Sequence, residues 1–190
     1  MKLIVALGNP GPEYAKTRHN TGFMVAGYYQ DKHHLADFSS KKKFHAEICE
    51  FSKNNQKIII AKPTTFYNLT GNAVRSLVDF YNISPENVLV IHDELMLDFG
   101  TIRVRDTGSD AGNNGLKSII SAIGQDFWRI RIGIKNSISD QLDSADFVTK
   151  PFSASEQLAM NSTILESASQ LIDHFIDGTL SKQTEKNLSL

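Results

Sequence analysis

The chain has very little cysteine, since Cys49 is the only one in 190 residues. A single thiol forms no intramolecular disulfide and cannot build a multi-cysteine zinc site. It is typical of a reducing compartment, so the sequence predicts a cytoplasmic protein. A folded chain of this size buries roughly 70% of the surface it exposes when unfolded, so its core needs no disulfide or metal ion.

Long apolar runs are also missing. The longest, Leu3 to Leu7 and Ile58 to Ala61, fall far short of the ~20 residues that cross a bilayer. The N-terminal apolar stretch is too short for a secretory signal and lacks a small-residue cleavage site. We therefore expect no transmembrane helix and no secretory leader.

Several standard functional motifs are absent as well. Gly8 and Gly11 are separated by only two residues, so no dinucleotide fingerprint follows the first apolar run. The run from Gly115 to Ser118 lacks the Gly-Lys-Ser adjacency of a phosphate-binding loop. The six histidines form no H-E-x-x-H pair, which leaves a metal site unsupported, and a G-x-S-x-G nucleophile motif is missing.

Net charge is small, at −1, but it is unevenly distributed. Residues 1–80 carry 11 Lys/Arg and 6 Asp/Glu, whereas residues 81–190 carry 9 and 15. Within the acidic half, residues 101–135 hold six Lys/Arg against three Asp. This segment is either a local basic surface or a set of solvated strand edges and helix faces, and charge alone leaves both interpretations open.

Alternating strand and helix patterns indicate the fold class. Strands are expected at 2–7, 44–51, 57–61, 87–91, 101–105 and 128–134, and helices from 21, from about 72, from 116 to 123 and from 153 to 176. A tight loop is expected from 93 to 100, and the polar tail from 181 is expected to be loose. The pattern predicts one α/β domain over residues 1–190, with a mixed, mostly parallel sheet covered by helices on both faces.

Two local patterns are especially clear. Trp128 to Ile134 alternates apolar residues with Arg129, Arg131 and Gly133, which predicts a strand with one buried and one basic face. Ser153 and Glu156 form a capping box at the start of the last helix.

Polar residues follow several predicted strands, where doubly wound sheets bind ligands. These residues are Asn9, His19, Asn68, Asp93, Asn113 and Asn114. Neutral amides suit a substrate rich in carbonyl and amide groups, because they donate and accept hydrogen bonds without the desolvation cost of an ion. The sequence therefore predicts a ligand site at one end of the sheet.

His19 and Asp93, without a suitable Ser or Cys nucleophile, indicate a general base acting on water. This pair predicts hydrolysis of an activated acyl bond. A plainer interpretation stays open on the residues alone, since a lone histidine is often a surface or core residue and an aspartate after a strand often caps a helix.

Several segments, together with Tyr14, closely resemble the motifs of a known family. They read LGNPG at 7–11, TRHNTG at 17–22, KPTTFYNLTG at 62–71, HDEL at 92–95 and NGLKSI at 114–119. The family is bacterial peptidyl-tRNA hydrolase, and the likeness continues in the same order through 129–134 and 147–151. It covers nearly the whole chain.

The resemblance implies a monomeric α/β enzyme without a cofactor. Such an enzyme cleaves the ester between a peptide's C-terminus and the terminal ribose of tRNA, and so recycles tRNA from prematurely released peptidyl-tRNA. By the same resemblance, His19 is the general base, Asp93 stabilises its basic form, and Asn9 discriminates peptidyl from aminoacyl substrates.

Other positions match the family's tRNA and substrate contacts. They are Tyr14, Phe66, Asn68 and Asn114, with Arg103 and Arg105 at positions where the family is often basic. Aromatic side chains can stack on an unpaired terminal base, and arginines can contact phosphate.

The chain departs from the family pattern in three places. Tyr67 stands where Met is common, and we expect it to change the wall of the peptide pocket but not the chemistry. Residues 107–113 replace a glycine- and histidine-rich stretch, and Asp110 there adds negative charge near the expected RNA path. The lid-like segment 139–146 carries three aspartates where positive charge would be expected.

Two further functions compete with ester hydrolysis. One is an RNA-binding relative on the same scaffold without catalysis, which turnover of peptidyl-tRNA would eliminate. The other is a small-molecule amidase or peptidase, which cleavage of a simple peptide at a matching rate would favour.

Overall fold

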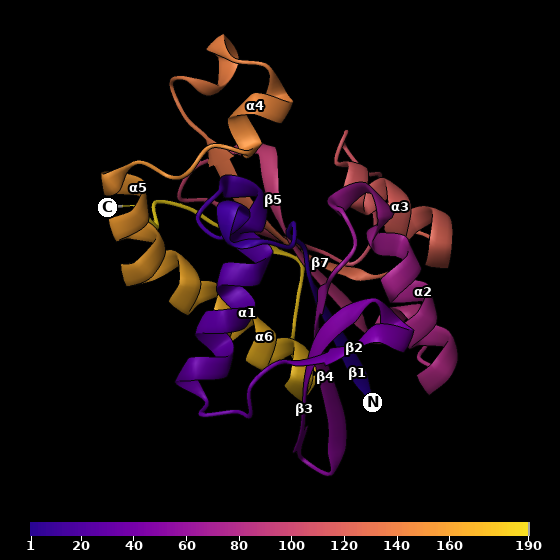
Figure 1. Ribbon diagram of the computed structural model, residues 1–190. Helices are drawn as coiled ribbons and strands as arrows, with labels where there is room; N and C mark the ends of the chain where they lie inside the picture. Colours follow the sequence, from indigo (N-terminus) through magenta and orange to yellow (C-terminus); the bar gives the residue numbers. More distant parts are fainter. Residues whose placement is uncertain (190) are drawn as a thin grey trace.

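Eight strands form a single mixed sheet in the computed structural model, which describes residues 1–189 (Figure 1). The order across the sheet is β2-β3-β4-β1-β5-β7-β6-β8. The strands are β1 (Lys2–Ala6), β2 (Ser39–Lys41), β3 (Ala46–Lys53), β4 (Gln56–Pro63), β5 (Val88–Asp98), β6 (Ile102–Arg105), β7 (Trp128–Lys135) and β8 (Gln183–Glu185). The α-helices are α1 (Thr21–Lys32), α2 (Thr70–Tyr81), α3 (Asn114–Ile123), α4 (Ser144–Val148), α5 (Ala154–Ala159) and α6 (Leu165–Asp177).

The predicted α/β class is confirmed, and the parallel part of the sheet lies at its centre. Strands β4, β1, β5 and β7 run parallel to one another. The edges are antiparallel, through the β2-β3-β4 meander on one side and β6 and β8 on the other. The sheet is therefore parallel only across its four central strands, because the β2-β3-β4 hairpins extend one edge and β6 with the C-terminal β8 extends the other.

Helices cover both faces of the sheet, as predicted. Helices α1, α5 and α6 pack on the face that carries Ile4 and Ile60, and α2 and α3 pack on the face that carries Val5 and Ile59 (Figure 1). These four side chains are completely buried. A strand covered on both faces needs apolar residues at every position, which explains the uninterrupted apolar run in β1.

The loop predicted from 93 to 100 is wrong, because β5 continues to Asp98. The strand keeps its pairing with β7 through Glu94 opposite Gly133, and resumes after a register shift with Asp98 opposite Lys135. Asp93 consequently lies inside a strand and not after one. Pairing with a distant strand extends β5 where the local sequence favours a turn.

The last helix differs from its prediction as well. The Ser153 and Glu156 capping box is confirmed, but the expected continuous helix is interrupted by a π-helical turn at Met160–Ile164. An extra residue in a helical turn breaks the regular hydrogen-bond ladder. The wider turn places the Thr163 hydroxyl against the carbonyl oxygen of Leu188 in the C-terminal segment.

The C-terminal tail, predicted to be loose from 181, is ordered through β8. Residues 183–185 pair antiparallel with β6, and Leu188 N donates to Gly100 O at 3.0 Å. Without β8, β6 would be an edge strand with unpaired backbone groups, and the tail satisfies them. Residue 190 lies outside the described residues. Among residues 1–189, no helix is long and apolar enough to cross a membrane.

Gly22 allows α1 to begin directly against the end of β1 and the backbone of β5 at Ile91. A Cβ at this position would lie 2.5 Å from Leu7 N and Ile91 O, which are backbone atoms of the sheet. We expect Gly22→Ala to lower the free energy of unfolding by about 1–3 kcal/mol, measured by urea denaturation. Gly27→Ala in the same helix is the control, because its Cβ would meet only the Lys62 amine at 3.8 Å. Equal stability of the two variants would contradict this account of α1.

Candidate active site

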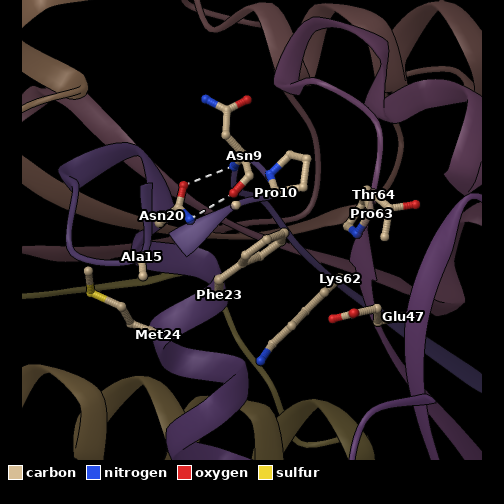
Figure 2. A pocket seen from close by; sticks show the side chains of 11 residues that line it. Asn9, Pro10, Ala15, Asn20, Phe23, Met24, Glu47, Lys62, Pro63 and Thr64 are labelled. Atoms are coloured by element: carbon tan, nitrogen blue, oxygen red, sulfur yellow. Dashed lines mark hydrogen bonds between the residues drawn. The ribbon is translucent and has the colours of Figure 1, made fainter. Parts of the chain in front are cut away.

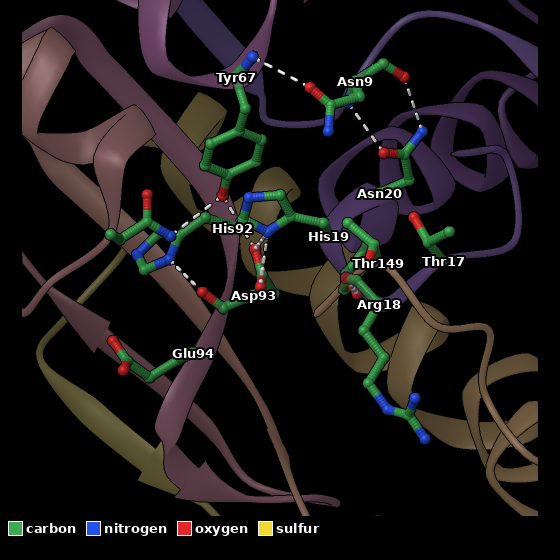
Figure 3. Close-up of polar contacts among 12 residues, drawn as sticks. Asn9, Thr17, Arg18, His19, Asn20, Tyr67, His92, Asp93, Glu94 and Thr149 are labelled. Atoms are coloured by element: carbon green, nitrogen blue, oxygen red, sulfur yellow. Dashed lines mark hydrogen bonds and ion pairs between the residues drawn. The ribbon is translucent and has the colours of Figure 1, made fainter. Parts of the chain in front are cut away.

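His19 and Asp93 meet near the C-terminal ends of the parallel strands (Figure 3). His19 lies in a short 3-10 helix, Arg18–Asn20, in the loop between β1 and α1, and Asp93 lies in β5. His19 Nδ1 is 3.0 Å from Asp93 Oδ1 and 2.9 Å from Oδ2. An ionised carboxylate can only accept, so Nδ1 carries the hydrogen and Nε2 is left with a lone pair.

The imidazole of His19 lines a cleft of about 320 Å³. Its side chain is 16% exposed, whereas that of Asp93 is 2% exposed. Asn114 at the start of α3 and Asp143 before α4 also line this cleft. Asp143 Oδ1 accepts a hydrogen bond from Ala145 N at 2.9 Å, so this lid aspartate caps α4. The cleft thus offers a ligand a reachable imidazole backed by a buried carboxylate.

Asp93 remains ionised despite its burial. Burial alone raises the pKa of its carboxyl group, but the charge and hydrogen bond of His19, nearby His92 and the Tyr67 hydroxyl together lower that pKa below its usual value. At neutral pH the carboxylate can therefore orient the imidazole and stabilise its protonated form.

Tyr67 contacts both members of this pair. Its hydroxyl donates to Asp93 Oδ1 at 2.8 Å, and its ring stacks on the His19 imidazole with centroids 3.5 Å apart and planes inclined by 16° (Figure 3). Burial first, and then the charge of Asp93, raise the pKa of Tyr67 well above its usual value, so the hydroxyl stays a donor. The sequence places Tyr67 in the wall of the peptide pocket, and the structure places it in direct contact with His19 and Asp93.

Asn9 is held in place by two neighbours. Its Oδ1 accepts a hydrogen bond from Tyr67 N at 3.0 Å, and its backbone N and O bond the Asn20 side chain at 2.8 and 3.0 Å (Figures 2 and 3). Asn9 also lines a second cavity, of about 330 Å³, together with Phe23 and Lys62 (Figure 2). Because its amide oxygen is occupied, the Asn9 amide nitrogen is the group available to a ligand.

The asparagines around α3 have separate roles. Asn113 caps the helix by accepting from Leu116 N at 3.0 Å, and its Nδ2 donates to the Tyr67 hydroxyl at 3.0 Å. Asn114 lines the His19 cleft and also a groove of about 670 Å³, which it shares with Asn68. The structure therefore brings His19, Asp93 and Asn114 to one cleft, and Asn68 lies in the adjoining groove.

Arg18 anchors the segment that carries His19. Its guanidinium is buried, pairs with Glu156 Oε2 at 2.8 Å and lies 4.4 Å from the centroid of the Phe147 ring. It also donates to the carbonyl oxygen of Pro151 at 2.9 Å. This contact was not predicted from the sequence, although the predicted capping box already includes Glu156. Arg18 thereby ties the His19 segment to the start of α5.

The remaining predicted contacts lie further out. Tyr14 is half-buried in a short 3-10 helix, and Phe66 is 63% exposed beside the groove residue Asn68. Arg103 Nε donates to Thr184 Oγ1 at 3.3 Å, and Arg105 Nη1 donates to Gln183 O at 3.3 Å. Strand β8 therefore occupies part of the hydrogen-bonding capacity of both arginines.

The second face of β7 is basic, as predicted, but it is not simply solvated. Arg129 is buried and donates to the carbonyl oxygens of Ser109 and Gln125. Arg131 pairs with Glu94 at 2.9 Å. Arg129 thus contacts the 107–113 loop, and Arg131 contacts the middle of β5 at Glu94. Within residues 1–189, no three His, Cys, Asp or Glu side chains are grouped to hold a metal ion.

The fold and this site together define an α/β enzyme with a paired histidine and aspartate. A family model described as peptidyl-tRNA hydrolase matches residues 3–189. The chain is 48% identical over 167 residues to the peptidyl-tRNA hydrolase of Rhodococcus jostii, covering 87% of each chain. It is 45% identical over 164 residues to that of Rickettsia bellii, covering 86% of this chain and 88% of the relative.

A solved structure agrees with these relatives. The fold is similar to the crystal structure of peptidyl-tRNA hydrolase from Acinetobacter baumannii, with a TM-score of 0.85 and 35% identity. The match covers 94% of this chain and 89% of that one. The chain therefore belongs to the peptidyl-tRNA hydrolase family and is an enzyme of that family.

Proposed function

We propose that the protein hydrolyses the ester between the peptide C-terminus and the terminal ribose of tRNA in peptidyl-tRNA. The observation that carries this proposal is the His19 imidazole, bound through Nδ1 to buried Asp93 and facing a cleft that Asn114 lines. A carboxylate on one ring nitrogen makes the other a general base at neutral pH.

In the proposed reaction, His19 Nε2 removes a proton from water as the water oxygen attacks the ester carbonyl carbon. Asp93 stabilises the imidazolium that forms. The tetrahedral intermediate collapses by breaking the bond to the ribose oxygen, and the imidazolium returns its proton to that oxygen. The products are a peptide carboxylic acid, which then loses its proton to solvent, and a tRNA with a free terminal ribose hydroxyl, and His19 is neutral again.

Amide and aromatic side chains near the cleft are suited to hold the two parts of the substrate. The Asn9 amide nitrogen can donate to a peptide carbonyl, since its oxygen is bound by Tyr67 N. Exposed Phe66 and half-buried Tyr14 offer faces for an unpaired terminal base. Further tRNA contacts are proposed at Asn68, Asn114, Arg103 and Arg105.

The proposed setting is tRNA recycling by a monomer in the cytoplasm, with no metal or cofactor. The buried free thiol of Cys49 is in keeping with a reducing compartment. The His19 and Asp93 pair supplies the acid and base steps of ester hydrolysis from side chains alone.

The deciding experiment follows release of N-acetyl-amino acid from N-acetyl-aminoacyl-tRNA, with unblocked aminoacyl-tRNA as the comparison substrate. We expect efficient hydrolysis of the blocked substrate and at most a slow residual rate on the unblocked one. Salt-sensitive tRNA binding without hydrolysis would instead indicate an RNA-binding scaffold. Equal cleavage of a simple peptide would indicate an amidase or peptidase.

Asn9→Ala tests the proposed discrimination. Removing one hydrogen bond to the peptide is expected to lower kcat/KM for N-acetyl-aminoacyl-tRNA about tenfold and leave the slow rate on unblocked substrate unchanged. The matched control is Asn161→Ala, which replaces an exposed asparagine in the π-helical turn, outside the three cavities described above. An equal loss on both substrates would argue against a discriminating role for Asn9.

A further inference from the structure

We propose that Tyr67 is a positioning residue for His19 and Asp93: its ring fixes the imidazole, and its hydroxyl favours the proton-accepting form of the pair (Figure 3). This inference rests on the proposed function of His19 and Asp93. It goes further by assigning a role to a residue that the sequence alone places in a pocket wall.

The contacts of the His19 imidazole restrict its rotation. A hydrogen bond from Nδ1 to Asp93 alone would let the imidazole of His19 turn about the axis joining the two groups. The Tyr67 ring, stacked at 3.5 Å with planes inclined by 16°, covers one face of the imidazole and removes that freedom. Together the two contacts set the direction of Nε2 before a substrate binds, which saves the entropy of ordering it during the reaction.

The two hydrogen-bond partners of the Tyr67 hydroxyl determine the direction of its hydrogen. Asn113 Oδ1 accepts from Leu116 N at 3.0 Å, so its NH₂ group faces Tyr67 and donates to the hydroxyl oxygen at 3.0 Å. An amide NH₂ can only donate, and the Asp93 carboxylate can only accept. The hydroxyl hydrogen is therefore directed at Asp93 Oδ1, 2.8 Å away.

This hydrogen bond is strongest when the negative charge of Asp93 is not shared with an imidazolium. The Tyr67 hydroxyl thus stabilises the state in which His19 is neutral and able to accept a proton. The other charged or ionisable groups that face the cluster are His92, Glu94 with its partner Arg131, and Asp143 across the cleft. None of these groups hydrogen-bonds the Tyr67 hydroxyl, whose partners are Asp93 and Asn113.

The packing around Tyr67 shows that its place is built for a ring. A Cβ at position 115 would lie 2.5 Å from Cε1 of Tyr67, so glycine there makes room for it. The side chain is buried at 4% exposure, and a buried hydroxyl needs hydrogen-bond partners. Both partners of this hydroxyl are side chains of the site, Asp93 and Asn113, and not backbone groups of the core. A side chain that only filled this space would not need a hydroxyl at all.

The test measures kcat and KM for N-acetyl-aminoacyl-tRNA between about pH 5 and 9 for wild type, Tyr67→Phe and Tyr67→Met. The phenylalanine variant keeps the stacked ring and loses only the hydroxyl. We expect the acid limb of its kcat/KM profile to move up by about half a pH unit, with KM within twofold of wild type. The methionine variant also loses the ring, and its kcat should fall about tenfold at unchanged KM. Tyr81→Phe, which removes a surface hydroxyl bonded to Glu50, is the control and should superimpose on wild type.

The outcomes separate this inference from the proposed function. Active wild type with a superimposable phenylalanine profile and an unchanged methionine kcat overturns the role of Tyr67 alone. If the phenylalanine variant does not fold, judged by its melting temperature, the methionine variant decides, and an unchanged kcat overturns the inference. Inactive wild type contradicts the proposed function, and the inference falls with it.

Discussion

Replacing His19 by alanine is expected to lower kcat for N-acetyl-aminoacyl-tRNA by about 10² to 10⁴-fold, the usual range for loss of a general base. In the proposed reaction no other group accepts the proton of the attacking water. Asp93 is a poor substitute, because its carboxylate is buried and accepts a hydrogen bond from the Tyr67 hydroxyl. KM should change little, since the imidazole acts on water and not on the tRNA.

The loss of activity in His19→Ala is expected without loss of the fold. The His19 side chain is partly exposed, and Asp93 keeps its hydrogen bond from Tyr67 in the variant. His174→Ala, an exposed histidine near the end of α6, is the matched control and should retain full activity. Circular dichroism and melting temperature check the fold. A fully active His19→Ala protein would refute the assignment of the base.

The second large effect is expected on stability, from Glu156→Ala. The substitution leaves the buried Arg18 guanidinium without its charged partner at 2.8 Å and also removes the capping box of α5. Breaking a buried ion pair from one side typically costs about 3–5 kcal/mol, because the remaining charge stays desolvated. We expect that loss in the free energy of unfolding, measured with urea at pH 7. Activity should fall too, since Arg18 adjoins His19.

The matched control for Glu156 is Glu166, which pairs with Lys32 at 2.7 Å on the surface. These two side chains are 35% and 31% exposed, so water screens their charges. Glu166→Ala should therefore cost less than about 1 kcal/mol. Equal losses in the two alanine variants would contradict the importance of burial around Arg18.

The stabilising effect of Glu156 should also depend on pH in a defined direction. Burial raises the pKa of its carboxyl group. Hydrogen bonds from Ser153 and Asn136 and the charge of Arg18 lower that pKa by more than burial raises it, so the pKa lies below its usual value. A lowered folded-state pKa contributes stability above the unfolded value of about 4.3, and that contribution is lost as pH falls through the folded value. The stability difference between wild type and Glu156→Ala should thus be steady from pH 6 to 8 and shrink below about pH 4.

The parts of the fold that the sequence predicts correctly are those determined by local patterns. The all-apolar run of β1 indicates a strand buried on both faces. The turn between β3 and β4 places Asn54 and Asn55 at positive φ, a conformation that asparagine tolerates, and the strands predicted at 44–51 and 57–61 pair through it as a hairpin. Ser153 and Glu156 define a helix start within four residues. Each of these signals is complete within a short stretch of chain.

The errors occur where a distant partner overrides the local preference. Pairing with β7 extends β5 through the segment that favours a turn, and so places Asp93 inside a strand. The open edge of β6 orders a tail whose polar composition predicts disorder. The Leu188 carbonyl lies against Thr163 in a π-helical turn that the helical pattern does not reveal. The free energy by which single residues prefer a turn or a helix is small compared with the cost of leaving buried backbone N–H and C=O groups without hydrogen bonds.

The sequence by itself determined the α/β class and, through strand-end positions and family motifs, pointed to His19, Asp93 and the asparagines. Only the tertiary structure decided what supports them. The Tyr67 hydroxyl on Asp93 and the Arg18 pair with Glu156 join residues 26 and 138 positions apart in the chain. Periodicity and turn chemistry report on neighbours in sequence, whereas burial and hydrogen bonding of these side chains depend on segments that meet only when the sheet is complete.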